Sequence, residues 1–175
     1  MRKLKLHELG RKTLEEFKEA EKNKLVVVLD NIRSGMNVGS FFRTADAFAV
    51  EKLYLCGITS KPPHREINKT AIGADHSVDW KHNEDIYSTI SRLKKEGYTI
   101  VAVEQIDKSI MLQDFEAEEN IKYALVFGNE VEGISESILP LVDLCLEIPQ
   151  SGTKHSFNVA VSGGIVLWHF LRKKM

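Results

Sequence analysis

The chain has 175 residues, of which 43% are hydrophobic and 28% are charged, and its formal net charge at pH 7 is −1. This length suits one domain of ordinary size, and the hydrophobic content excludes a chain that is disordered throughout. The near-zero charge excludes a protein that coats nucleic acid non-specifically, so contacts with RNA must come from local basic clusters. Such clusters lie in residues 2–12 and 172–174.

The first half of the chain contains the patterns of two helices, two strands and a later short helix. Residues 13–22 predict a helix that Thr13 caps, with Glu16 completing a capping box. The β-branched run of residues 24–29 predicts a buried strand. From Asn37 onward the apolar residues repeat at helical spacing, and residues 52–56 form a second expected strand. Residues 64–71 follow a Pro-Pro loop and predict a short helix.

The second half continues the alternation of helices and strands. Its expected helices are residues 83–96, 135–142 and 158–173, and its expected strands are residues 98–103, 123–127 and 143–148. Such alternation predicts an α/β fold with a mostly parallel sheet covered by helices on both faces. We expect a short basic N-terminal extension with a helix, residues 1–23, followed by one domain, residues 24–175.

Signals of secretion, membrane insertion and metal binding are missing from the sequence. Cys56 and Cys145 lie in apolar runs and are expected to be buried thiols of a reducing compartment. No Cys/His/Asp cluster has ligand spacing, so no metal is expected. The most apolar stretch, residues 159–171, is shorter than the ~20 residues that span a bilayer, and the first residues lack the apolar core of a signal peptide. These patterns predict a cytoplasmic protein with no membrane contact.

Three loops that follow strands are richer in Gly, Asn and Ser than turns require, namely residues 31–45, 127–135 and 148–159. In open α/β sheets, ligands bind beyond the carboxyl ends of the strands. Gly128, Gly133 and Gly152 permit a close approach of backbone to a ligand such as an adenine ring. The sequence lacks GxGxxG and GxxxxGK[ST], which disfavours a dinucleotide enzyme and a P-loop NTPase. The segment AVSGG, residues 160–164, lies inside an expected helix, which disfavours a serine hydrolase.

Together these loops resemble the three motifs of the SpoU family of RNA methyltransferases. The first motif is NxGxxxRTA from Asn37, the second is FGNExxG from Phe127, and the third is IPxxGxxxSxNV from Ile148. The chain departs from the usual pattern at Val131, where Gly is common, and at Phe157, where Leu is common. The resemblance implies a C-terminal trefoil knot, S-adenosyl-L-methionine (AdoMet) as cofactor, and transfer of its methyl group to a ribose 2′-hydroxyl of tRNA or rRNA.

The resemblance also assigns roles to individual residues. Arg43 corresponds to the arginine that acts as catalytic base or anchors it. Arginine stays protonated far above neutral pH, so a bidentate grip on a phosphate beside the target ribose is the role that its chemistry favours, and both roles remain open. Glu130 is expected to orient Arg43 or Asn37. Ser156 and Asn158 are expected to hydrogen-bond the arginine or the ribose, and Asn37 to cap its helix.

The remaining expected site residues surround this centre. By resemblance, Val103, Gly128, Ile148 and Phe157 line the AdoMet pocket, and Arg33, His64 and Arg65 lie near strand ends where they could contact RNA phosphates. A homodimer is expected because the last helix is apolar around most of its circumference, and because the family places its active site at the subunit interface. The basic segments favour tRNA over rRNA as substrate. The alternatives are an RNA-binding or assembly factor with the same fold but no turnover, and an unrelated α/β enzyme with another cofactor.

Overall fold

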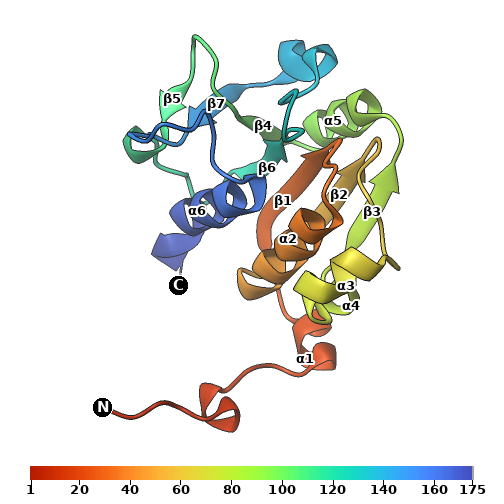
Figure 1. Cartoon of the computed structure of the whole chain (residues 1–175), viewed down its shortest axis with the longest axis vertical. Coiled ribbons are helices and arrows are strands. Elements are labelled where there is room, and N and C mark those ends of the chain that lie inside the picture. Colours follow the sequence, from red (N-terminus) through yellow and green to blue (C-terminus); the bar gives the residue numbers. More distant parts are fainter. Residues whose placement is uncertain (175) are drawn as a thin grey trace.

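The computed structural model describes residues 1–174 and contains one sheet of seven parallel strands. The strands run in the order β3-β2-β1-β6-β4-β7-β5, as Figure 1 shows. The expected mostly parallel α/β sheet is therefore confirmed. Its strands are β1 (Asn23–Asp30), β2 (Val50–Cys56), β3 (Trp80–Asn83), β4 (Tyr98–Val103), β5 (Ile110–Met111), β6 (Lys122–Phe127) and β7 (Leu144–Glu147).

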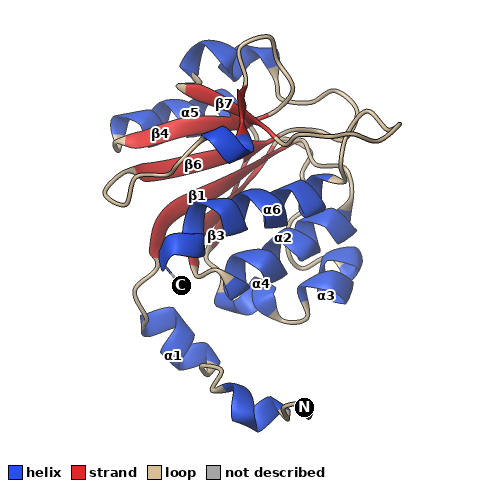
Figure 2. Cartoon of the chain, turned by 90° about the vertical axis from the view of Figure 1, so that its left-hand side faces the viewer, coloured by secondary structure: helices blue, strands red, loops and turns tan. Residues whose placement is uncertain are grey.

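Helices cover both faces of the sheet, as expected (Figure 2). One face carries α2 (Gly35–Ala47), α3 (Arg65–Ala71), α4 (Ala74–Ser77) and α6 (Val159–Leu171). The other face carries α5 (Ile86–Lys95) and the 3₁₀ helix η3 (Glu136–Leu141), in which Pro140 lies. Alternation along β1 divides its side chains between two cores, with Leu25, Val27 and Leu29 on the α2 side and Val26 and Val28 on the α5 side.

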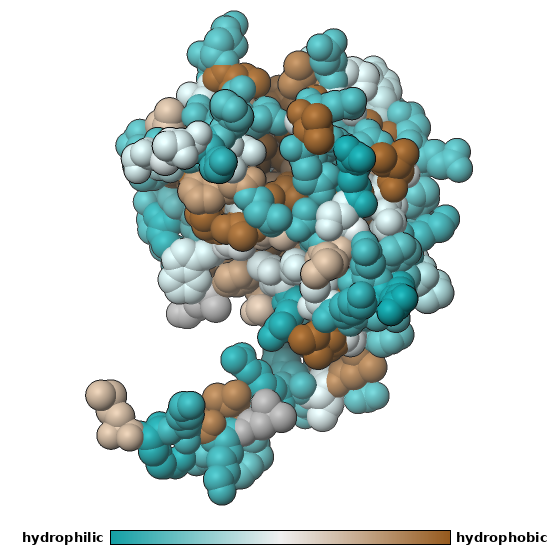
Figure 3. Space-filling view, in the orientation of Figure 1, coloured by the Kyte–Doolittle hydropathy of each residue, from teal (hydrophilic) through white to brown (hydrophobic). Residues whose placement is uncertain are grey.

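The N-terminal extension projects from this body, and its helix α1 contacts α4 (Figures 1 and 3). It contains the 3₁₀ helix η1 (Leu6–Leu9) and the helix α1 (Leu14–Glu19), and α1 has no buried residue. The expected capping box is confirmed, because Thr13 accepts from the Glu16 N–H and the Glu16 carboxylate accepts from the Thr13 N–H. The expected helix to residue 22 is too long. Ala20 is extended, and the Lys22 ammonium donates to the carbonyl groups of Phe17 and Ala20.

Several element boundaries differ from the sequence patterns. Helix α2 begins at Gly35, because Ser34 caps it by accepting from the Asn37 N–H; the expectation that Asn37 is the cap is wrong. Helix α5 begins at Ile86 with Asp85 as its cap, and Asn83 instead ends β3. The strands β3 and β5, the short helix α4, and the 3₁₀ turns η2 (Leu112–Asp114) and η4 (Arg172–Lys174) are too short to produce a periodic pattern.

Candidate functional site

The Glu130 carboxylate joins the loop after β6 to the start of α2. It accepts from the backbone N–H groups of Arg33 at 2.9 Å and Ser34 at 3.2 Å, and from the Asn37 side-chain amide at 2.9 Å. Of the two expected partners of Glu130, Asn37 is therefore the one that it contacts within this chain. The N-terminus of α2 also favours a negative charge at this position.

Asn158 brings the third loop into the same group. Its side-chain oxygen caps α6 by accepting from the N–H groups of Ala160 and Val161, while its amide nitrogen donates to the Asn37 oxygen at 3.1 Å. Capping and a site contact are thus combined in one side chain. Asn37, Glu130 and Asn158 come from the three loops noticed in the sequence, and they form one chain of hydrogen bonds at the carboxyl end of the sheet.

A buried network lies beneath this chain of hydrogen bonds. The fully buried Asp30 carboxylate, at the end of β1, accepts from the Ser135 N–H at 2.7 Å and from the Ser135 hydroxyl at 3.1 Å. The Asn129 amide donates to the Asn31 carbonyl at 2.7 Å, and Asn31 itself has a positive φ of 54°. Two contacts therefore fix both ends of the 128–135 loop on the end of β1. No motif of the sequence marks Asp30 as a support of the site.

A cleft opens between the ends of β4, β6 and β7 and the exposed segment 149–158. It has two adjoining parts of about 400 and about 110 Å³, which share Val103, Glu104 and Phe157 in their lining. Ser156 also lines both parts, Gly128 lines the larger part and Ile148 lines the smaller part. All four residues expected to line a cofactor pocket therefore meet in one cleft, and its size suits a small organic molecule.

The charged side chains that line the cleft are the carboxylates of Glu104, Glu130 and Glu147. Burial raises the pKa of the Glu130 carboxyl, but the N–H groups of Arg33 and Ser34 and the Asn37 amide outweigh it, so the pKa is lower than usual. The carboxylate is thus ionised at neutral pH. Burial raises the pKa of the Cys56 thiol to about 12 and that of the Cys145 thiol to about 11. Neither thiol is therefore poised as a nucleophile.

Arg43 lies outside this cleft. It is exposed on α2, six residues beyond Asn37, which is about 9 Å along a helix axis. It lines a separate hollow of about 670 Å³ between α2, α4 and the N-terminal extension. Within residues 1–174, Arg43 makes no ion pair or hydrogen bond, and its neighbour Asp46 instead accepts from the Ser77 hydroxyl. Within one chain, Glu130, Ser156 and Asn158 therefore do not hydrogen-bond Arg43; Glu130 instead has the other expected partner, Asn37.

The three candidate RNA-binding residues lie around the start of α2 and α3. Arg33 and Arg65 are exposed, and the His64 imidazole caps α3 by accepting from the Glu66 N–H. His64 also packs so closely on Gly35 that a Cβ there would lie 3.0 Å from its ring. Part of the role of His64 is therefore structural.

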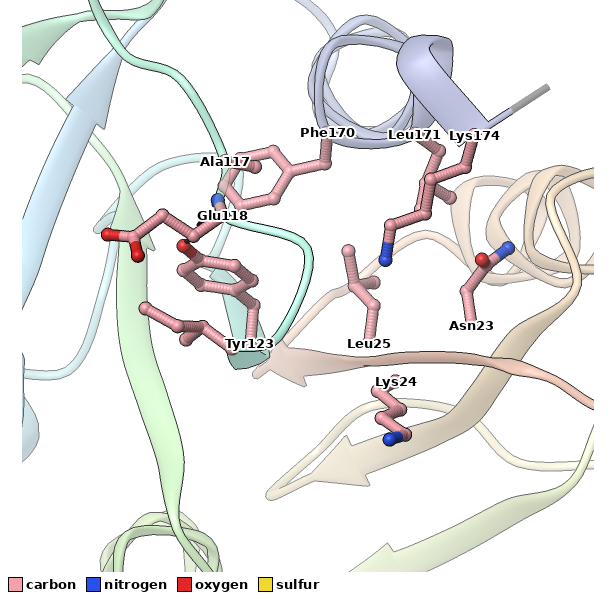
Figure 4. Close-up of a pocket in the computed structure, with 10 residues that line it drawn as sticks. Asn23, Lys24, Leu25, Ala117, Glu118, Tyr123, Phe170, Leu171 and Lys174 are labelled. Carbon is pink, nitrogen blue, oxygen red and sulfur yellow. Dashed lines mark hydrogen bonds between the residues drawn. The ribbon is translucent and has the colours of Figure 1, made fainter.

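At the opposite end of the sheet lies a narrow pocket (Figure 4), beside an open polar hollow of about 320 Å³ that shares Asn23, Lys24 and Lys174 with it. The rings of Tyr123 and Phe170 lie 5.1 Å apart there, and the cavity of about 20 Å³ has room for about one water molecule. In the part of the chain that the structure describes, no helix is long and apolar enough to span a membrane, and no three His, Cys, Asp or Glu side chains are grouped as metal ligands.

The family is decided by the match of one family model. The model of the SpoU rRNA Methylase family matches residues 24–168, which include β1 from its second residue, the other six strands and most of α6. The chain belongs to the SpoU family. The identification made from the three sequence motifs is therefore confirmed.

Individual relatives show the same similarity. A tRNA (guanosine(18)-2′-O)-methyltransferase of Borreliella burgdorferi is 30% identical over 151 residues, which are 86% of this chain and 67% of that protein. Other relatives are much longer: the chain is 31% identical to a mouse protein, TARBP1, with the same enzyme name, and it spans 10% of that protein's length.

Solved structures of RNA-modifying enzymes share the fold. The A. aeolicus TrmH/SpoU tRNA modifying enzyme superposes with a TM-score of 0.81 and 27% identity, covering 92% of this chain and 80% of that one. An AdoMet-bound rRNA methyltransferase from Sinorhizobium meliloti has a TM-score of 0.81 at 24% identity, and the matched part covers 91% of this chain and 60% of that one.

The two residues that depart from the SpoU pattern, Val131 and Phe157, differ in their position relative to the cleft. Val131 is 76% exposed and lies outside the cleft lining, so its side chain does not narrow the pocket. Phe157 lines both parts of the cleft and is 40% exposed, so its ring leaves apolar surface available to a ligand. Glu104 lines the cleft but lies in none of the three motifs. Its position directly after a parallel strand is the sequence signal that could have identified it.

We expect Asn37→Ala to raise the pKa of the Glu130 carboxyl toward its ordinary value of 4.5, because one donor to the carboxylate is lost. Folding lowers this pKa, so the carboxylate stabilises the fold above pH 4.5, and this contribution is lost as the pH falls through the folded-state value. An NMR titration of the Glu130 side chain measures the midpoint. The exposed Asn68 on α3 provides the control Asn68→Ala; an equal midpoint in all three proteins would contradict the prediction.

Proposed function

We propose that this SpoU protein is an AdoMet-dependent RNA methyltransferase that acts on a ribose 2′-hydroxyl. The observation that carries the proposal is the hydrogen-bonded group Asn37, Glu130 and Asn158, which joins the three SpoU motifs beside the cleft. Incubation with radiolabelled AdoMet and bulk RNA, followed by nucleoside analysis, tests it. Labelled 2′-O-methylnucleosides are expected; RNA binding without label would favour an assembly factor instead.

The cleft suits AdoMet in size and chemistry. When bound, AdoMet supplies a methyl group already activated by its sulfonium charge. Val103, Ile148 and Phe157 offer apolar surface for an adenine ring. Gly128, at the end of β6, also lines the cleft, and its lack of a side chain lets the backbone of Gly133 pack against it. The acidic lining complements a cationic ligand, since Glu104, Glu130 and Glu147 are the charged residues there.

The second half of the reaction requires a group that positions the ribose and takes up its proton. Arg43 suits this task through a bidentate grip on the neighbouring phosphate, which can help to accept the proton, or as a base itself if its proton is removed. Its exposed position without a partner in the described chain leaves its guanidinium available. Ser156, which is exposed and lines the cleft, is a candidate to hydrogen-bond the ribose or the arginine of another subunit.

We infer that the complete site forms in a homodimer, because Arg43 and the cleft are separate within one chain. Helix α6 leaves the apolar residues Val161 and Trp168 exposed by 51% and 53%, and Trp168 continues the surface of Phe48 at the end of α2. Hydrophobic side chains also gather around α6 in Figure 3. A two-fold interface along this face would bury them.

Val161→Glu is expected to convert the dimer into a folded monomer, because burying a charge in the interface destabilises the dimer. This monomer should transfer little methyl, because Arg43 no longer faces the cleft of the partner subunit. Light scattering measures the mass of the particle, and circular dichroism reports whether the chain is folded. Tyr87→Glu is the control, since Tyr87 is 49% exposed on α5, on the other face of the sheet. A fully active Val161→Glu monomer would contradict the proposed interface.

We favour tRNA over rRNA as the substrate. The B. burgdorferi and A. aeolicus relatives are named for tRNA, and exposed basic residues extend from the catalytic domain in the segment 2–12. Arg33, His64 and Arg65 are candidate phosphate contacts at the edge of the site. Mapping 2′-O-methyl groups in tRNA and rRNA from cells with and without the gene, with tRNA guanosine 18 examined first, identifies the substrate.

Three structural expectations belong to the same proposal. Residues 1–23 form an extension and residues 24–175 the methyltransferase domain, which agrees with the family match from residue 24 and with the absence of buried residues in α1. The C-terminal segment forms the trefoil knot, which an experimental chain trace of residues 148–158 would test. A cytoplasmic location agrees with an RNA substrate and with the two free thiols.

A further inference from the structure

Glu104 occupies the junction between the two parts of the cleft. It follows Val103 at the carboxyl end of β4, lines both parts, and is half-buried. Its backbone is fixed on both sides, because its N–H donates to the Leu146 carbonyl at 3.1 Å and its carbonyl accepts from the Cys145 thiol. The position of this carboxylate is therefore set by the sheet rather than by a mobile loop.

The two carboxylate oxygens of Glu104 each have one backbone donor. Oε1 accepts from the Gln105 N–H at 2.9 Å, and Oε2 accepts from the Ile134 N–H at 3.2 Å. Gly133, with a φ of +71°, leaves no side chain in this space, and a Cβ there would lie 2.4 Å from Oε2. A carboxylate oxygen can accept two hydrogen bonds, so one acceptor position remains on each oxygen.

The other acidic residues of the cleft have different contacts. Glu130 accepts three hydrogen bonds from the start of α2 and Asn37, whereas Glu147 lines only the smaller part of the cleft and accepts from the Ser109 hydroxyl at 2.7 Å. Glu104 thus offers a fixed pair of adjacent acceptors inside the cleft. The ligand group that matches two adjacent acceptors is a vicinal diol, whose two O–H groups point to one carboxylate. Carboxylates recognise nucleoside riboses in this way at strand ends of other α/β folds.

We infer that Glu104 binds the 2′- and 3′-hydroxyls of the cofactor's adenosine ribose. This inference rests on the proposed function, since it assigns the orientation of AdoMet within the cleft. It places the ribose at the end of β4, between the apolar surface of Ile148 and Phe157 and the Asn37–Glu130–Asn158 group. Glu104 thereby becomes a specificity residue for adenosine ligands that have both hydroxyls.

Calorimetry with S-adenosylhomocysteine and its 2′-deoxy and 3′-deoxy analogues tests the inference without turnover. The wild-type protein is expected to bind each deoxy analogue about ten-fold or more weakly, the loss typical of a hydrogen bond to a charged group. Glu104→Ala is expected to bind all three ligands weakly and within about two-fold of one another. Glu104→Gln, which keeps one acceptor, should show an intermediate dependence on the hydroxyls.

Glu132→Ala is the control, because Glu132 is an exposed acid outside the cleft lining, in the 128–135 loop that Glu104 contacts through the Ile134 N–H. It should bind as the wild type does. A wild-type protein that binds all three ligands equally overturns the inference even if Glu104→Ala fails to fold. Glu104→Ala weakening all ligands by one factor, with the discrimination retained, would reduce Glu104 to a support of the 128–135 loop. No binding of S-adenosylhomocysteine would instead overturn the proposed function.

Discussion

Arg43→Ala is expected to abolish methyl transfer to RNA while leaving AdoMet affinity within a few-fold of wild type. Arg43 lies outside the cleft and lacks a hydrogen-bond partner within the described chain, so its loss should not disturb the cofactor half of the site. Removing one preorganised electrostatic group typically costs ~3–4 kcal/mol, or a ~10²–10³-fold drop in rate. Single-turnover assays measure the rate, and calorimetry the affinity.

Arg43→Lys separates charge from geometry. Lysine keeps the positive charge but loses the planar fork, so little activity should return if Arg43 grips a phosphate with two donors. Near-normal turnover in Arg43→Ala would show that this residue is only part of a helix surface. A large loss of AdoMet affinity would instead place Arg43 in the cofactor half of the site.

Mixing two inactive variants tests whether the two halves come from different subunits. Gly128→Ala should spoil the cleft, because a Cβ there would lie 2.2 Å from the backbone of Gly133. After co-refolding with Arg43→Ala in equal amounts, about half of the dimers are mixed, and each mixed dimer has one intact site if the site is shared. Activity should return to about a quarter of wild type. If Arg43 and the cleft of one chain act together, no activity returns.

Gly39→Ala is expected to destabilise the fold and to reduce activity with it. A Cβ at Gly39 would lie 2.1 Å from the Thr70 hydroxyl and 2.4 Å from the Ile67 carbonyl oxygen, where α2 and α3 touch. Such overpacking costs about 1–3 kcal/mol or more, against at most about 1 kcal/mol gained from the helix propensity of alanine. Because the clash involves backbone, a change of rotamer cannot relieve it.

Thermal unfolding measures this effect, with a fall in Tm of roughly 2–4 °C for each kcal/mol lost. Gly152→Ala is the control, because nothing lies within 4 Å of a Cβ at Gly152 and its backbone conformation is an ordinary one. Its Tm should match the wild type. A Gly39→Ala variant as stable as wild type would mean that α2 and α3 separate at little cost.

The grouping of Asn37, Glu130 and Asn158 could be predicted from the sequence because it follows from the topology of the sheet. Asn37, Glu130 and Asn158 all follow strands, and parallel strands bring their carboxyl ends to one edge of the sheet. The position of Arg43 was harder to predict. The number of residues between Asn37 and Arg43 in the motif does not show whether Arg43 faces the cleft of its own chain or lies outside it. Glu104 was missed because it stands alone after β4, without the glycines that mark the other loops.

Helix α2 carries parts of both halves of the reaction, since Asn37 is hydrogen-bonded beside the cleft and Arg43 lies further along the same rigid helix. If the arginine of one subunit contributes to the active site of the other, each α2 connects two active centres. A shift of Asn37 when one cleft fills would then move the arginine of the opposite centre. Such a coupling is reciprocal: ligand binding at one centre would change the affinity of the other centre by the same factor in both directions.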